Sequence, residues 1–191
     1  MDLNHLISNA QHMPNIPKVV QELIQSFGDE NVDSGEVAAK LSKDQAMTAL
    51  KNAISNALTA FEGKGLTIEQ RDGKVYVSME NKLLFKSGSW AVGTEGKKAI
   101  QQLGKVLGEN PDIAVLIEGH TDNVPIRTRQ FPSNWELSSL RAVNVARLFE
   151  KVGVKKDQLS AIAYADTRPK LPNTDETGNA IPANQGANRR V

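Results

Sequence analysis

Apolar side chains recur at helical spacing through the first 61 residues of the chain. The spacing predicts three helices, with a turn at residues 28–31 and a third helix that begins at Asp44. This third helix carries its apolar stripe from Met47 to Phe61, and the glycines at positions 63 and 65 end it. We therefore expect this part of the chain to be helical.

The pattern changes to alternation after residue 65. Residues 66–69 and 75–79 alternate apolar and polar side chains on either side of Asp72-Gly73. Asp-Gly between two alternating segments is a strong signal for a β-hairpin, because both residues accept the positive φ angles of a tight turn. The apolar triplet at residues 83–85 predicts a further short strand.

Helices and strands are predicted to alternate in the rest of the chain. A helix is expected over residues 94–108, and the continuous apolar run at residues 113–117 predicts a covered strand. The S-x-x-E sequence at residues 133–136 is a capping box that opens another helix. Residues 159–164 predict a strand, and a short helix is expected to start near Pro182. This alternation indicates helices packed on a sheet.

Composition and charge narrow the class of protein. The chain has 191 residues, 39% hydrophobic and 24% charged, which is enough to bury a core. It has no cysteine, which excludes disulfides and thiolate chemistry. We expect neither a secretory leader nor a membrane-inserted segment, because no apolar run approaches roughly 20 residues. Residues 1–49 carry a net charge of −4 and residues 50–191 carry +5, which indicates two modules but no nucleic-acid partner.

The candidate catalytic and metal-binding residues form no recognisable motif. His5, His12 and His120 fall in different predicted elements, so nothing supports a metal site built on them. Ser138, His120 and Asp122 can be written as a triad, but no nucleophile-elbow motif surrounds the serine. We therefore expect no metal, no cofactor and no enzymatic activity.

Two polar motifs stand next to predicted elements. The sequence G-H-T-D-N at residues 119–123 follows the apolar strand, at the strand end where α/β sheets place ligand sites. The sequence N-x-x-L-S-x-x-R-A-x-x-V begins at Asn134 and places Arg141 near the start of the next helix. Asp122 and Arg141 are therefore expected to face each other. Their spacing alone favours a structural ion pair and leaves a ligand site as the alternative.

Together with N-R-R at residues 188–190, these motifs resemble the OmpA-like (OmpA/Pal/MotB) peptidoglycan-binding domain. The resemblance covers about residues 80–191, and the second half is most similar to the MotB branch. It implies an α+β fold, a βαβαβ sandwich of helices on a small mixed sheet, preceded by N-terminal helices and the β-hairpin. The family's final strand begins where this sequence stops, so that strand is expected to be truncated and a sheet edge to be unpaired.

The resemblance implies non-enzymatic, non-covalent binding of peptidoglycan through the diaminopimelate of its stem peptide. Such binding would anchor a cell-envelope or flagellar-motor protein to the wall, in the periplasm, and a homodimer is possible in this family. Asp122 would hold the ammonium group of diaminopimelate, and Arg141 would hold the carboxylate bidentately. Residues expected at the rim of the site are Thr121, Asn134, Leu137, Ser138 and Arg189, the last with a structural ion pair to an acid as its alternative.

Two features depart from this family. Gln185 stands where the family usually has arginine, which favours an alternative in which an assembly module keeps the fold but does not bind the wall. Residues 1–49 resemble the start of an HDOD domain, a helical signalling module, with a natural helical linker as the other interpretation. We therefore predict a chimera with joins near residue 48 and residues 120–127. Its parts would be residues 1–49, a linking helix and hairpin at 50–80, and the binding domain at 81–191.

Overall fold

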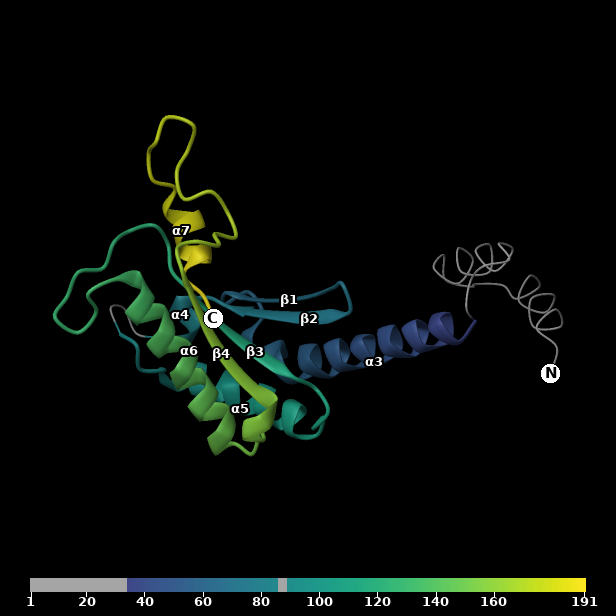
Figure 1. Ribbon diagram of the computed structural model, residues 1–191. Coiled ribbons are helices and arrows are strands. Elements are labelled where there is room, and N and C mark those ends of the chain that lie inside the picture. Colours follow the sequence, from purple (N-terminus) through teal and green to yellow (C-terminus); the bar gives the residue numbers. More distant parts are fainter. Residues whose placement is uncertain (1–33, 86–88) are drawn as a thin grey trace, which may run out of the picture. The chain divides into compact units, whose positions relative to one another are not determined.

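The computed structural model describes residues 34–85 and 89–191 of the chain (Figure 1). The chain divides into two compact units, Met1–Ala46 and Met47–Val191. Of the first unit, the structure describes only the beginning of helix α3 (Ser34–Leu58). The helix predicted before the turn at residues 28–31 and most of the HDOD resemblance lie outside the described residues, and all the candidate site residues lie in the second unit.

Helix α3 runs without a break through Asp44, so the predicted helix boundary at that residue is wrong. Residues 42–46 contain neither glycine nor proline, and a single aspartate within a helix costs too little to interrupt it. The helix ends before the short helix η1 (Thr59–Phe61). No helix within the described ranges has the length and apolar character needed to cross a membrane. The predicted stripe is confirmed, since its buried members are Leu50, Ile54, Leu58 and Phe61.

The predicted β-hairpin is confirmed. Strands β1 (Leu66–Arg71) and β2 (Lys74–Met79) pair antiparallel, with Arg71 opposite Lys74 at the turn. Asp72 and Gly73 between them have φ angles of 51° and 66°. These positive values are the reason that this turn requires an Asp-Gly pair.

The apolar triplet after the hairpin forms a helical turn, so the predicted strand at residues 83–85 is wrong. Helix α4 (Asn81–Leu84) is closed by backbone hydrogen bonds from Leu83 and Leu84 to the carbonyl of Glu80, at 3.0 and 3.2 Å. A helical turn buries Leu83, Leu84 and Phe85 together, whereas a strand would direct successive side chains to opposite faces. Only Phe85 is extended, in a single bridge to Val92.

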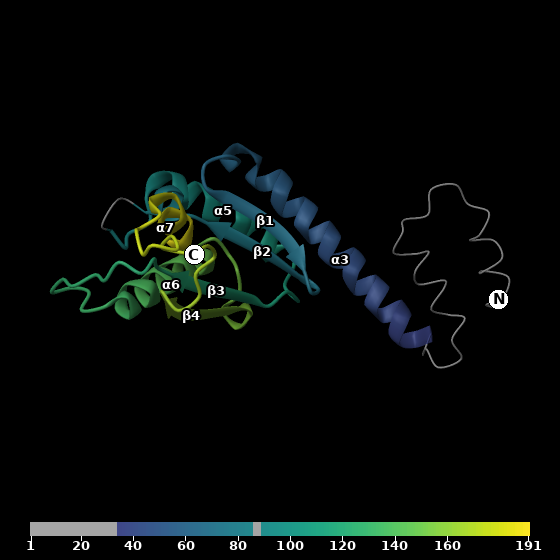
Figure 2. The ribbon, with the colours of Figure 1, turned by 90° about the horizontal axis from the view of Figure 1, so that it is seen from above.

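The remaining elements form the predicted helix and strand alternation. Helix α5 (Thr94–Gly108) is followed by strand β3 (Val115–His120), helix α6 (Asn134–Lys151), the short helix η2 (Lys156–Gln158) and strand β4 (Leu159–Ala165). Strands β3 and β4 pair in parallel, and α6 crosses over between them and packs on both (Figure 1, Figure 2). Helix α5 packs against α6 and α4. Helix α7 (Pro182–Asn188) confirms the short helix expected near Pro182.

The C-terminal residues join two separate two-stranded sheets. Strands β1 and β2 form one sheet, and β3 and β4 form the other. Val191 exchanges backbone hydrogen bonds of 2.9 and 3.0 Å with Met79 at the end of β2, and the carbonyl of Arg190 accepts the backbone N–H of His120 at the end of β3. The small mixed sheet is thus present as two pairs of strands linked at Arg190 and Val191.

Strand β3 approaches helix α6 unusually closely at Gly119. A Cβ atom at this position would lie 2.1 Å from the carbonyl oxygen of Ser138, well inside van der Waals contact. Glycine is therefore required here for steric reasons, because it allows the strand to approach the helix backbone. The contact brings the loop after β3 toward the first turns of α6, which carry the second polar motif.

We expect Gly119→Ala to lower the free energy of unfolding by about 3 kcal/mol, because the added methyl group must displace backbone rather than a flexible side chain. Urea unfolding followed by circular dichroism measures this change. The matched control is Gly108→Ala, where the new Cβ would contact only the carbonyl of Gly153 at 3.8 Å. Equal midpoints for wild type and Gly119→Ala would contradict the close contact.

Candidate functional site

Asp122 is buried and follows strand β3 at the start of a largely exposed loop. The backbone N–H of Thr121 donates to the carbonyl of Ala165 at the end of β4, at 2.8 Å, and the Thr121 hydroxyl donates to the Asp122 carbonyl at 2.9 Å. The Asp122 Oδ1 atom accepts the backbone N–H of Val124 at 3.3 Å. Asp122 is only 4% exposed, so its carboxylate is fixed within the protein.

Arg141 is buried in helix α6 without a carboxylate partner. Its guanidinium lies over the ring of Phe85 at 4.8 Å, and Nη2 donates to the carbonyl of Ser89 at 3.0 Å. The Nε atom is buried and has no hydrogen-bond partner among the described residues. No described carboxylate lies within ion-pair distance of this side chain, so the predicted Asp122–Arg141 ion pair is absent. Arg141 is a buried cation whose Nε–H lacks an acceptor.

The pKa of Arg141 reflects this environment. The pKa of Arg141 is lowered to about 10, mainly by burial and also by the positive charge of Arg189, while Asp122 acts in the opposite direction. These interactions place Asp122, Arg141 and Arg189 within electrostatic range of one another. We call these three residues the ionic site, and its formal net charge is +1.

Arg189 is the residue that pairs with Asp122. Its Nη1 atom donates to the Asp122 Oδ2 atom in an ion pair. The Arg189 side chain is 40% exposed, whereas that of Asp122 is 6% exposed. The structural ion pair left open for Arg189 by the sequence is therefore present in this structure.

Asn134 holds the loop that follows Asp122. Its Oδ1 atom accepts the backbone N–H of Ile126 at 3.2 Å, and its Nδ2 atom donates to the carbonyls of Asp122 and Val124 at 3.3 and 3.2 Å. The predicted capping box is also present: Ser133 Oγ accepts from the backbone of the first helical turn, and Glu136 Oε2 accepts the backbone N–H of Ser133 at 2.8 Å. The side-chain amide of Asn134 therefore holds the loop backbone in place.

Ser138 is fully buried, and both hydrogen bonds of its hydroxyl go to backbone groups. It is 0% exposed, and its hydroxyl donates to the carbonyl of Trp135 and accepts the backbone N–H of Ala165. Ala165 has a φ of 47°, which is unusual for a residue other than glycine, and the Ser138 bond helps to hold it there. A buried hydroxyl with both partners in the backbone is not an activated nucleophile. Leu137 is also buried, at 7% exposure.

The residues around α7 position Arg189. Asn188 is fully buried; its Oδ1 atom accepts the backbone N–H groups of Lys170 and Leu171, and its Nδ2 atom donates to Leu171 and Asn173. Gln185, where the family usually has arginine, donates to Asn123 Oδ1 at 3.1 Å. Sequence reasoning missed this contact, and it also missed Phe85 and the Ser89 carbonyl beside Arg141.

His120 belongs to a neighbouring cluster. Its ring stacks on Tyr164 at 5.3 Å and its Nε2 atom lies 3.2 Å from Glu118 Oε2. Burial lowers the pKa of His120, although Glu118 opposes the shift. In the described part of the chain, no three His, Cys, Asp or Glu side chains gather as a metal site requires.

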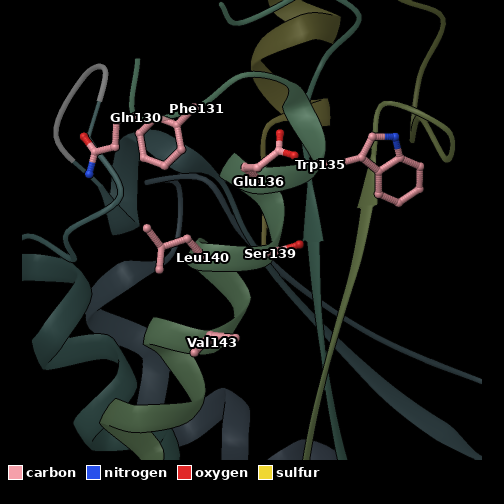
Figure 3. Close-up of a pocket in the computed structure, with 7 residues that line it drawn as sticks. All are labelled: Gln130, Phe131, Trp135, Glu136, Ser139, Leu140 and Val143. Atoms are coloured by element: carbon pink, nitrogen blue, oxygen red, sulfur yellow. The ribbon is translucent and has the colours of Figure 1, made fainter. Parts of the chain in front are cut away.

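A separate pocket of about 430 Å³ lies on the more exposed side of α6 (Figure 3). Leu140 and Val143 contribute from the helix, while Phe131 comes from the preceding loop and Trp135 extends away from Leu140. None of the residues of the ionic site lines this pocket. The charged groups, rather than this depression, therefore define the candidate binding site.

The parallel β-α-β unit and the C-terminal residues bring together the buried Asp122 and Arg141 and the partly exposed Arg189. The comparison with known families identifies the class: the OmpA family matches residues 84–183, and the chain belongs to this family. Membership confirms the resemblance found in the sequence. Family membership also agrees with the expectation that the chain is not an enzyme.

Individual relatives agree with this assignment. The chain is 29% identical to Motility protein B of Helicobacter pylori (strain J99) over 143 residues, which are 74% of this chain and 56% of that protein. A structure of the periplasmic domain of Helicobacter pylori MotB is 30% identical, with a TM-score of 0.58 over 69% of this chain and 78% of that one. The cell wall anchor of the T6SS from Pseudomonas aeruginosa is 28% identical, with a TM-score of 0.61 over 72% and 92% of the two chains.

The comparisons do not support the predicted chimera. The chain spans about half the length of the curated relative from Helicobacter pylori, 56% of it. The family match runs through residues 120–127, where a join is predicted, and gives that join no support. The HDOD origin of residues 1–49 and the three-part division of the chain stay predictions.

We expect Arg141→Met to raise the free energy of unfolding by about 1–3 kcal/mol, because an apolar side chain replaces a buried cation that has no carboxylate partner. Urea unfolding at neutral pH measures the change. Arg147→Met is the matched control on the exposed side of the same helix, where about 0.5 kcal/mol or less is expected. A marked loss of stability in Arg141→Met would show that the guanidinium is a structural group.

Proposed function

We propose that the chain binds peptidoglycan non-covalently and anchors a cell-envelope or flagellar-motor protein to the cell wall. The single observation that carries the proposal is the ionic site in a chain of the OmpA family. Relatives named as a cell wall anchor and as the periplasmic domain of MotB support the wall and the periplasm as the setting. The proposed activity is binding without catalysis.

The finer part of the proposal is that the ligand is the diaminopimelate of the stem peptide. Its free end carries an ammonium and a carboxylate on one carbon atom. A carboxylate gives Arg141 the acceptor that its buried Nε lacks, in the bidentate geometry that a guanidinium prefers. The ammonium would be bound by Asp122, which is too deeply buried to serve a large cation. Thr121 and Leu137 line the approach in this proposal.

One observation favours the alternative of an assembly module that keeps the fold without binding the wall. Asp122 is already paired with Arg189, so the acceptor proposed for the ammonium is occupied in this structure. In that alternative the ionic site is purely structural. A homodimer stays a prediction under either function.

We expect Asp122→Asn and Arg141→Ala each to weaken binding to purified, diaminopimelate-containing cell wall by roughly tenfold or more, since charge-assisted hydrogen bonds contribute about 1.5–3 kcal/mol. Co-sedimentation of the folded chain with cell wall measures the affinity. Matched controls are Asp112→Asn and Arg147→Ala, which remove exposed charges of the same kind.

A second experiment uses cell wall in which lysine replaces diaminopimelate. It distinguishes binding to the wall in general from recognition of diaminopimelate. Equal binding to both walls would overturn the choice of diaminopimelate and leave wall binding in place. Folded wild type that does not sediment with either wall would favour the assembly module.

A further inference from the structure

Arg189 occupies the carboxylate to which the proposed function assigns the ammonium of the ligand. Its Nη1 atom donates to Asp122 Oδ2, while Asp122 Oδ1 accepts the backbone N–H of Val124 at 3.3 Å. Both carboxylate oxygens are therefore engaged before a ligand arrives. Because the Asp122 side chain is only 6% exposed, the guanidinium of Arg189 is one of the groups that cover it.

The carboxylate and the ammonium group of a zwitterionic ligand therefore find different environments in the ionic site. A ligand carboxylate meets Arg141, which is buried, lacks an ion-pair partner and has one N–H without an acceptor. A ligand ammonium meets Asp122, whose charge Arg189 already neutralises. The ligand carboxylate accepts from the unpaired Arg141 Nε–H, whereas the ligand ammonium must compete with Arg189 for Asp122.

The Arg189 side chain is free to leave while its backbone stays in place. The carbonyl of Arg189 accepts the backbone N–H of Asn81 at 2.8 Å, and Val191 pairs with Met79 two residues later. The side chain is 40% exposed, so its guanidinium can rotate into solvent without breaking these backbone bonds. Departure of Arg189 also relieves its repulsion of Arg141, which contributes to the lowered pKa of that residue.

We propose that Arg189 determines the specificity of the ionic site by holding Asp122 until the ammonium group of the ligand displaces it. The proposal rests on the proposed function and deepens it. A full ligand supplies a carboxylate for Arg141 and a cation that replaces Arg189. A carboxylate alone binds while Arg189 stays in place, and an amine alone does not compete with the intramolecular pair.

The test compares two peptides by calorimetry. One is the tripeptide L-alanyl-γ-D-glutamyl-meso-diaminopimelate, and the other lacks the free amine at the distal carbon. The variant is Arg189→Gln, which removes the charge and keeps a hydrogen-bond donor. Arg129→Gln is the matched control, because it lowers the net charge equally from an exposed loop position.

Arg189→Gln is expected to bind the full tripeptide roughly three- to tenfold more tightly than wild type, the effect of removing a partly exposed competing ion pair. The ratio of the two peptide affinities should grow by a similar factor in this variant and stay constant in Arg129→Gln. Because both affinities are measured on the same variant, partial loss of folded protein cancels in the ratio.

Weaker binding of the full tripeptide by Arg189→Gln, with an unchanged ratio, would overturn the displacement and make Arg189 a direct ligand contact. If wild type binds the tripeptide and Arg141→Ala does not, but the ratio fails to grow, the role of Arg189 fails while the proposed function stands. If folded wild type binds neither peptide nor cell wall, both proposals fail together.

Discussion

The contact between strand β3 and helix α6 at Gly119 is the constraint on which the site depends. The absent side chain leaves room for the carbonyl of Ser138, and the Ser138 hydroxyl accepts the backbone N–H of Ala165 at the end of β4. Both strands are therefore fixed to one turn of the helix. This turn lies between Asn134, which holds the loop after Asp122, and Arg141, so the burial of these charged groups follows from the architecture.

The ionic site is costly for the folded protein. A guanidinium with 4% exposure that lacks a carboxylate partner carries a desolvation penalty, which the contact with Phe85 and the bond to the Ser89 carbonyl offset only in part. Natural proteins break such rules mainly at functional sites. The fully bonded amide of Asn188 nearby shows the contrast, because its buried polar atoms are all satisfied within the chain.

Local signals in the sequence were sufficient for much of the fold. The Asp72-Gly73 turn and the Ser133 capping box depend on neighbouring residues alone, and both are present. The helix boundary predicted at Asp44 was wrong because an aspartate that can cap a helix is also tolerated within one. The triplet at residues 83–85 misled because three apolar residues do not distinguish a strand from a helical turn.

The ion pair of Asp122 was not predictable from spacing along the sequence. Spacing alone placed Asp122 opposite Arg141, which lies on the next element of the chain. The actual partner is Arg189, which is brought there because the C-terminal residues lie between the ends of β2 and β3. The hydrogen bond from Arg141 to the Ser89 carbonyl could not be predicted from the sequence, since every residue has a backbone carbonyl.

The most direct measurement of the central claim is the NMR signal of the Arg141 Nε–H group during titration with the diaminopimelate tripeptide. This signal is expected to move downfield and to exchange more slowly with water as the peptide saturates, because the buried N–H gains an anionic acceptor. The signal of the exposed Arg147 should stay where it is. An unchanged Arg141 signal at saturating peptide would contradict the account.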